Sequence, residues 1–140
     1  MILISIKPEF VEKILSGEKT IELRKSKPDA ATGDLIILYS TAPVKAIVGF
    51  CVIDNIIVGK PGVFWDKHHA DCGIDKMRFF EYYENYNKVI GIKLKEIYRL
   101  PKKINLQTVR SNWPRFSPPQ TYKYLSKSEV LRWYSEQLMS

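Results

Sequence analysis

Three charged side chains, Lys19, Glu22 and Arg24, stand close together in a segment that could hold a polar ligand. The β-branched and aliphatic residues between them favour a strand, and successive side chains of a strand point to opposite faces. Glu22 and Arg24 would therefore share one face, roughly 7 Å apart at Cα, and Lys19 could reach them from the turn at Gly17. In an enzyme, Glu22 could transfer a proton as a general acid–base while Lys19 stabilises developing negative charge. The alternative is a solvated edge strand with surface ion pairs that contribute little.

Two hydroxyl side chains, Tyr39 and Ser40, end the apolar run from Leu35 to Ser40. That run predicts a strand that is buried on both faces. Hydroxyl groups at the end of a strand can bind phosphate or a base edge, although they are equally ordinary in turns. We interpret both residues as candidates for ligand binding.

Aromatic residues that lie beside basic or amide side chains form a third group of candidates. Trp65, Trp113 and Tyr122 could stack on an unpaired base, an interaction worth roughly 1–3 kcal/mol per base. Segment 110–124 interleaves aromatic and basic residues and also contains Arg115 and Gln120. We therefore predict that this segment and Trp65 contribute to a binding site. The alternative is that the aromatic residues belong to the core.

The sequence predicts neither a metal site nor a cofactor. The cluster with metal-capable side chains is Asp66, His68, His69 and Asp71. Adjacent histidines point in different directions, and no second pair of ligands occurs at a zinc spacing. We interpret the cluster as a polar loop that precedes a helix.

The elements that must position these residues follow from hydrophobic patterning. Strands are predicted over residues 2–6, 19–25, 35–40, 46–58 and 89–100. Pro8 suits the first turn of a helix that ends at Gly17. Gly49 would allow a bulge or bend in its strand. Beyond Pro101 we expect irregular chain, with Ile104 and Leu106 in a last short strand.

Two helical segments are predicted outside these strands. Segment 63–86 should be a helical insertion, begun by Asp71 or Asp75. Its apolar residues recur every three positions, at Ile74, Met77, Phe80 and Tyr83. Ser126 and Glu129 form a capping box that starts a C-terminal helix. The apolar positions of that helix are Val130, Leu131, Tyr134 and Leu138.

Length and composition indicate one domain over residues 1–140. The net charge of +7 favours a polyanionic partner such as nucleic acid. Cys51 and Cys72 are too few for a disulfide scaffold and lack the CxxC spacing of a metal site. We therefore expect both to be free thiols in a reducing cytoplasm. The N-terminal residues begin a strand pattern directly, so we expect neither a signal peptide nor a membrane span.

Several segments resemble the ASCH family, which has a PUA-like barrel fold. The most specific is Gly17-x-Lys19-x-x-Glu22-x-Arg24, preceded by the helix that starts at Pro8. Similar segments follow in the same order at residues 38–49, 64–65, 79–83 and 118–125. The resemblance implies RNA binding, and some family members act on RNA or on modified nucleosides.

The resemblance also implies an alternative class, a hydrolase. The ASCH-like acetylcytidine amidohydrolases use a lysine, a threonine and a distant glutamate. Lys19 matches the lysine, but Glu22 occupies the position of the threonine, and Glu81 or Glu84 would have to serve as the distant glutamate. This departure argues against a threonine nucleophile. A Lys19–Glu22 pair could still act on a nucleoside or, as a ribonuclease, on RNA.

The sequence thus predicts an α+β fold, a small mixed, mostly antiparallel β-barrel with flanking helices and one helical insertion. The predicted function is recognition of RNA or a nucleotide, with Lys19, Glu22 and Arg24 at the floor of a cleft. Arg24 would hold a phosphate or a base acceptor, and Glu22 would accept from an exocyclic amine or a 2′-hydroxyl. The loop at residues 118–122 would form one wall. A third hypothesis for the function is a protein-interaction module that uses the aromatic C-terminal region. The sequence does not identify a protein partner.

Overall fold

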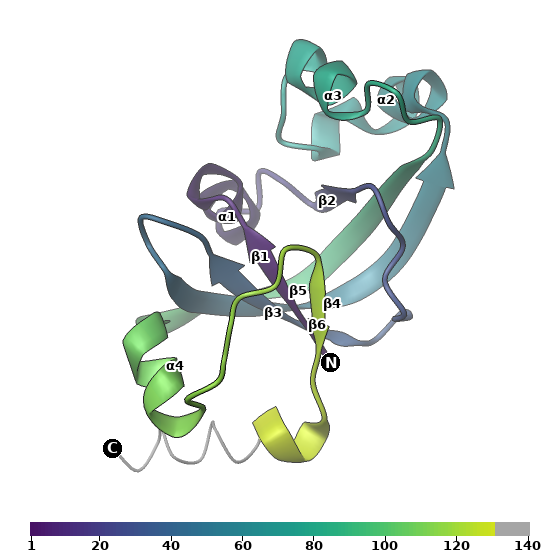
Figure 1. Cartoon of the computed structure of the whole chain (residues 1–140). Helices are drawn as coiled ribbons and strands as arrows, with labels where there is room; N and C mark the ends of the chain where they lie inside the picture. The colour runs from purple at the N-terminus through teal and green to yellow at the C-terminus, as the bar shows by residue number, and fades with distance from the viewer. Residues whose placement is uncertain (131–140) are drawn as a thin grey trace.

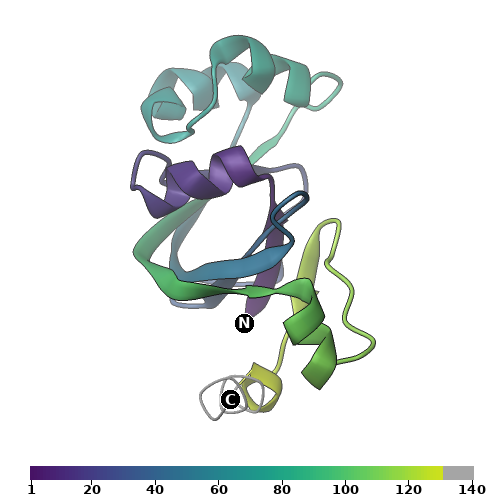
Figure 2. The same ribbon diagram turned by 90° about the vertical axis from the view of Figure 1, so that its left-hand side faces the viewer.

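A computed structural model describes residues 1–130, which form one curled six-stranded sheet with helices around it (Figure 1). The strand order is β2-β5-β4-β3-β1-β6. Strand β1 runs parallel to β3, and all other neighbouring strands are antiparallel. Figure 2 shows the sheet curling into an open half-barrel. The predicted α+β class with a mixed, mostly antiparallel sheet is therefore confirmed.

The N-terminal half alternates strands with one short helix, as its hydrophobic pattern predicts. Strand β1 spans Ile2–Ile6, and helix α1 spans Pro8–Leu15 with its proline in the first turn. Gly17, at φ +86°, supplies the left-handed turn that leads toward β2. The next elements in the chain are β2 (Ile21–Arg24), β3 (Leu35–Ser40) and β4 (Ala46–Gly59).

Gly49 lies at an irregularity of the β4 ladder. A Cβ atom there would lie 2.5 Å from the backbone oxygen of Tyr98, which is closer than real side chains approach. The prediction that this glycine marks a bend is therefore confirmed, and the reason is the close approach of the β5 backbone.

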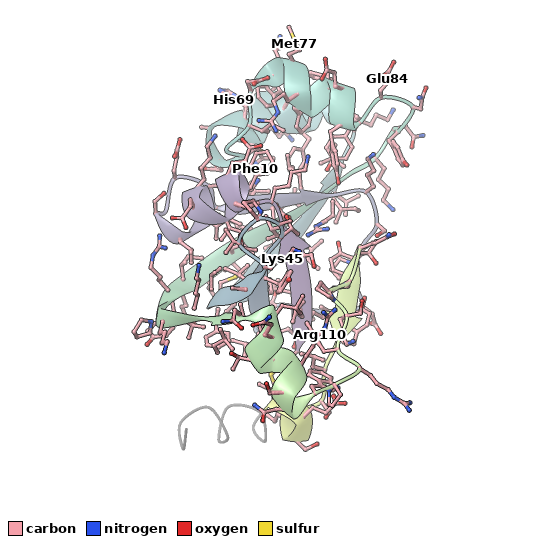
Figure 3. All side chains as sticks on the ribbon, turned by 60° about the vertical axis from the view of Figure 1, so that its left-hand side comes forward. Phe10, Lys45, His69, Met77, Glu84 and Arg110 are labelled. Carbon is pink, nitrogen blue, oxygen red and sulfur yellow. The ribbon has the colours of Figure 1, made fainter. Side chains whose placement is uncertain are left out.

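The helical insertion consists of α2 (Pro61–His68), the 3₁₀ turn η1 (His69–Asp71) and α3 (Lys76–Tyr82). Asp75 caps α3 by accepting from the Arg78 backbone N–H. The predicted three-residue apolar step holds for Tyr83 but is wrong for Met77 and Phe80, which are exposed. Phe79 and Tyr83 are buried, whereas Met77 is 73% exposed and projects from the outer surface (Figure 3). The buried side chains follow the four-residue spacing that one face of a helix also allows.

The structure corrects the prediction for the chain beyond Pro101. Strand β5 continues through the proline and spans Val89–Asn105. Gly49 pairs with Arg99 whereas Ile47 pairs with Ile104, so several β5 residues bulge opposite this part of β4. Pro101 lies in that bulged stretch, where its missing N–H disturbs no regular ladder.

Leu106, which the sequence places in a last short strand, instead begins helix α4 (Leu106–Asn112). The physical reason is the residue before it. Asn105 accepts a hydrogen bond from the Thr108 backbone N–H at 2.9 Å and so caps the helix.

The C-terminal part returns to the sheet. Strand β6 (Tyr122–Tyr124) pairs antiparallel with β1 at the sheet edge. The predicted capping box is present, because Ser126 N donates to Glu129 and Glu129 N donates to Ser126 Oγ. Residues 127–130 are helical. Leu131, Tyr134 and Leu138, predicted for the same helix, lie outside the described residues.

Alternation along β1 and β3 divides the core between the two faces of the sheet. Ile4 and Leu38 belong to the inner cluster under α1, whereas Leu3 and Ile37 belong to a second cluster under α4. A third cluster joins β2 and β5 to the insertion and includes Phe64 and Phe79. None of the helices within residues 1–130 has the length and apolar character needed to cross a membrane.

Candidate functional site

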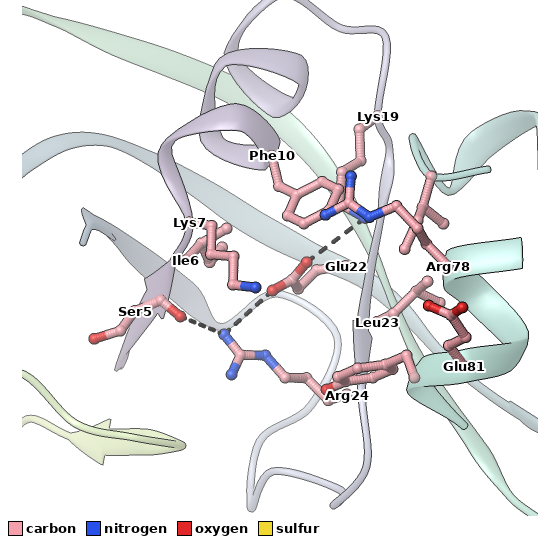
Figure 4. A pocket seen from close by; sticks show the side chains of 12 residues that line it. Ser5, Ile6, Lys7, Phe10, Lys19, Glu22, Leu23, Arg24, Arg78 and Glu81 are labelled. Carbon is pink, nitrogen blue, oxygen red and sulfur yellow. Dashed lines mark hydrogen bonds and ion pairs between the residues drawn. The ribbon is translucent and has the colours of Figure 1, made fainter. Parts of the chain in front are cut away.

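A pocket of about 450 Å³ opens between β1, α1, β2 and the helical insertion (Figure 4). Its floor is the charged face of β2, and α3 contributes the opposite wall. The lining residues are Ser5, Ile6, Lys7, Phe10, Lys19, Glu22, Leu23, Arg24, Ile74, Arg78, Glu81 and Tyr82. Lys19, Glu22 and Arg24 therefore meet in one pocket, as their spacing predicts.

Lys19 is a buried cation whose N–H groups are committed within the protein. Its ammonium group donates to the backbone oxygens of Ile21 and Cys72, each at 2.6 Å, and lies 3.6 Å from Oε1 of Glu22. Only 2% of the residue is exposed. Burial lowers the pKa of Lys19, and the charge of Glu22 partly opposes that shift. The lysine thus fastens the insertion to β2 and fixes one oxygen of Glu22.

Glu22 is held from its other side by Arg24. Nη2 of Arg24 lies 3.2 Å from Oε2 of Glu22 and donates to the backbone oxygen of Ser5 at 2.8 Å. The carboxylate is therefore oriented by two cations, and Arg24 links β2 to β1 through Ser5. A buried charge with good partners on both sides is far less mobile than a surface ion pair.

Tyrosine side chains cover Arg24. The ring of Tyr122 lies 5.6 Å from the Arg24 guanidinium carbon, and its hydroxyl donates to the Ser26 backbone oxygen at 2.7 Å. The Tyr83 hydroxyl donates to the Arg24 backbone oxygen at 2.8 Å. Burial raises the pKa of both phenols, so they remain neutral donors. Together they fix the end of β2.

The structure separates the remaining predicted site residues from this pocket. Tyr39 packs against Phe116 in the cluster under α4, and Ser40 is buried at the end of β3. Trp65 packs against Phe79 inside the insertion. None of Tyr39, Ser40 and Trp65 lines the pocket.

The aromatic residues that follow α4 lie in two places, Trp113 in the cluster under α4 and Tyr122 beside Arg24. Trp113 packs against Phe116 at 5.3 Å between ring centroids, in the cluster under α4. Arg115 and Gln120 are exposed and do not line the pocket. Tyr122 alone among these residues contacts Arg24. It does not line the pocket, so the wall predicted for residues 118–122 is wrong, and α3 provides that wall instead. Roles for Arg115 and Gln120 in binding stay predictions.

Several pocket residues were not singled out by their sequence pattern. Phe10 belongs to the apolar stripe of α1, yet it also lies 5.5 Å from the Lys19 ammonium. Arg78 and Tyr82 come from α3, more than fifty residues beyond β2. Of the two candidates for the distant glutamate, Glu81 lines the pocket, whereas Glu84 lies on the outer surface (Figure 3). The sequence feature that could have identified Arg78 is the N-cap at Asp75. The cap fixes where α3 begins and therefore which of its side chains share a face.

Residues 1–130 contain no group of three His, Cys, Asp or Glu side chains placed to hold a metal ion. The pocket itself is lined by charged, polar and aromatic side chains. These supply a fixed carboxylate, the two cations that hold it, and aromatic walls.

The ASCH domain family profile matches residues 4–104. This chain belongs to the ASCH domain family. The matched range contains the whole pocket described above and ends at the last residues of β5. Membership agrees with the resemblance carried by Lys19, Glu22 and Arg24.

Similar proteins support the family and the fold of this ASCH domain. An ASCH domain-containing ribonuclease of Zymomonas mobilis is 31% identical over 127 residues, which are 91% of this chain and 85% of that protein. A crystal structure of ASCH from Zymomonas mobilis superposes with a TM-score of 0.90 at 30% identity and covers 96% of this chain and 93% of that one. A hypothetical protein from Leishmania major has a TM-score of 0.57 at 13% identity over 98% of this chain and 95% of its own, and shares the fold alone.

Proposed function

We propose that this protein binds single-stranded RNA by taking one nucleotide into the pocket. The observation that carries the proposal is the Glu22 carboxylate, fixed at the pocket floor between Lys19 and Arg24. A fixed carboxylate can accept from the amino group of an unpaired base or from a ribose 2′-hydroxyl. The pocket volume of about 450 Å³ suits one small ligand, since such sites measure roughly 300–1,000 Å³.

The surroundings of Glu22 support a nucleotide. Tyr82, which is 37% exposed, gives the pocket aromatic surface on which a base can stack, and Lys7 and Arg78 line it with positive charge. Within residues 1–130, the buried side-chain polar atoms that lack a hydrogen-bond partner are Ser5 Oγ and Arg24 Nε, and both residues line the pocket. The net charge of +7 favours a polyanion. A relative that is named a ribonuclease supports RNA as the ligand.

The proposal is tested by fluorescence anisotropy with a short fluorescein-labelled single-stranded RNA of mixed sequence. Affinity should fall steeply with added salt, because each phosphate contact releases counterions. The same RNA annealed to its complement should bind more weakly, because a paired base cannot enter the pocket. Absence of binding at low salt, or equal affinity for the duplex, would overturn the proposal.

Cleavage of the bound strand is a second candidate, favoured by the ribonuclease name of the Zymomonas mobilis relative. Glu22 would take the proton of a 2′-hydroxyl, and the 2′-oxygen would attack the adjacent phosphorus. The bond from phosphorus to the 5′-oxygen would break, and water would return a proton to that oxygen. The products would be a 2′,3′-cyclic phosphate and a 5′-hydroxyl.

Cleavage is tested with the same RNA and with a copy whose 2′-hydroxyls are methylated. The methylated strand should bind and stay intact, while the natural strand should yield cyclic phosphate ends. Glu22→Gln should lower the rate by roughly two to four orders of magnitude. Cleavage by this variant at the wild-type rate would remove Glu22 from the reaction.

We further propose that the protein acts in the cytoplasm. Cys51 and Cys72 are both free and buried, and unpaired cysteines are usual in a reducing compartment. Localisation of a fluorescent fusion tests this proposal.

A further inference from the structure

Arg78 joins the helical insertion to helix α1 at the edge of the pocket. Its guanidinium group forms a forked pair with the Glu9 carboxylate, with N···O distances of 2.7 and 3.1 Å. The guanidinium carbon lies 5.1 Å from the ring centroid of Phe10. Figure 4 shows Arg78 extending from α3 over the Phe10 ring toward the pocket.

The other cations at the pocket floor are already used by the protein. Lys19 bonds two backbone oxygens, and Arg24 bonds Ser5 and Glu22. If either moved to a ligand, Glu22 would be left as a buried carboxylate with a missing partner, which is strongly unfavourable. Lys19 therefore has no N–H group left for a phosphate, and Arg24 keeps Nη2 for Glu22 and Ser5, while its Nε without a partner is buried.

The Arg78–Glu9 pair differs from these buried contacts because it is open to solvent. The side chains of Arg78 and Glu9 are 41% and 47% exposed, and an exposed ion pair contributes little to stability. The two free oxygens of an RNA phosphodiester present the same pair of acceptors to a guanidinium as a carboxylate does, with the same charge of −1. A ligand phosphate can therefore replace Glu9 without loss of hydrogen bonds to Arg78.

We propose that Arg78 is the phosphate-binding residue of the pocket and that Glu9 occupies its guanidinium group until a nucleotide phosphate takes the place of the carboxylate. The proposal rests on the RNA-binding function proposed above and assigns one contact within it. Lys7, exposed and also lining the pocket, would be the second cation near the phosphate. Displaced Glu9 remains in the first turn of α1, where a negative charge is favourable.

Helix α1 also provides a matched control pair. Glu12, one turn beyond Glu9, forms a forked pair with Arg99 of β5 at 2.9 and 3.4 Å. That pair is exposed as well, at 52% for Arg99 and 64% for Glu12, but neither residue lines the pocket. Glu9→Gln and Glu12→Gln thus remove the same charge from the same helix and free one arginine each. Only the first frees an arginine in the pocket.

The experiment measures binding of the fluorescein-labelled single-stranded RNA over a salt series for each variant. Arg78→Met should weaken binding about tenfold and lower the slope of log affinity against log salt by about one, the value for one lost phosphate contact. Arg99→Met should leave the slope unchanged. Glu9→Gln should tighten binding about two- to fivefold, the factor set by release of an exposed ion pair. Glu12→Gln should increase RNA affinity less than Glu9→Gln does. The double variant Glu9→Gln/Arg78→Met should bind RNA with the same affinity as Arg78→Met alone.

The salt slope separates a phosphate contact from packing, because loss of the contact between Arg78 and Phe10 alone would not change it. Arg78→Lys keeps the charge and loses the fork, so it should bind between wild type and Arg78→Met. It also replaces the methionine variant if that variant does not fold. Wild-type affinity and slope in the Arg78 variants, or equal effects of Glu9→Gln and Glu12→Gln, would overturn this assignment. Failure of the wild-type protein to bind RNA would instead overturn the function on which it rests.

Discussion

Nη2 of Arg24 lies 3.2 Å from Oε2 of Glu22, with both residues on one face of β2. Because Lys19 lies near the other carboxylate oxygen, the Glu22 side chain has little freedom to rotate. A ligand that enters the pocket therefore meets an acceptor that is already oriented, which reduces the entropy lost on binding. The proposed binding of RNA depends on this arrangement.

Glu22→Gln tests whether the carboxylate contacts the ligand. The substitution keeps the shape and removes the charge, so RNA affinity should fall by about 1–2 kcal/mol. Thermal unfolding should show a loss of stability as well, because Lys19 and Arg24 lose their anionic partner. Glu81→Gln is the control, since Glu81 lines the same pocket but is exposed. Equal affinities of wild type and Glu22→Gln would mean that the ligand does not reach the pocket floor.

Lys19→Met tests the structural part of the site. The change leaves the backbone oxygens of Ile21 and Cys72 without their donor and leaves Glu22 with one cation. Urea unfolding should show a loss of roughly 3 kcal/mol. Lys13→Met is the matched control, because Lys13 bonds the neighbouring Gly73 oxygen at 3.0 Å from a more exposed position, and should cost about 1 kcal/mol. Equal losses in the two variants would contradict the role given to burial.

The two cysteines should be unreactive in the folded protein. Burial raises the pKa of Cys51 to about 12 and that of Cys72 to about 11, from 9.0. Iodoacetamide should therefore modify neither thiol at neutral pH until urea unfolds the chain. Since both folded pKa values exceed the unfolded value, the thiols' contribution to stability is complete below pH 9 and is lost as the pH rises toward 11 and 12. Labelling of the native protein at the rate of the unfolded chain would show that the cysteines are accessible.

Tyr122 should act through Arg24. Tyr122→Phe keeps the ring over the guanidinium and loses the hydrogen bond to Ser26, so stability should fall by about 1 kcal/mol with RNA binding retained. Tyr122→Ala uncovers Arg24 and should weaken RNA binding, with only a moderate change in Tm because β6 is an edge strand. If Tyr122→Ala instead lowers Tm strongly and leaves binding intact, the residue serves the core alone.

The pocket floor could be predicted from the sequence because local rules determine it. Alternation along one strand puts Glu22 and Arg24 on one face, and the Gly17 turn leads the chain toward Lys19. The opposite wall could not be predicted in the same way. Arg78 reaches the pocket through the packing of α3 on β2 and β5. The buried face of α3 combines Phe79 with Tyr83, whereas Met77 and Phe80 of the three-residue pattern are exposed.

Residue type alone also failed to distinguish the two faces of the sheet. Tyr39 and Trp113 have side chains suited to ligand binding, yet both pack in the cluster under α4. Their positions follow from the pairing of β1 with β3 and from the return of the chain after α4. These are contacts between residues far apart in the sequence, and no local pattern encodes them.

The most direct measurement is a two-dimensional ¹H–¹⁵N NMR titration of the protein with a short single-stranded RNA. We predict that changes in backbone amide chemical shift concentrate in residues around the pocket, including Ile6, Leu23 and Ile74, and that Glu22→Gln reduces these changes. Amides of the cluster under α4, such as those of Val109 and Phe116, should change little. Shifts centred on α4 and residues 113–121, with the pocket unaffected, would contradict the assignment of this pocket as the RNA-binding site.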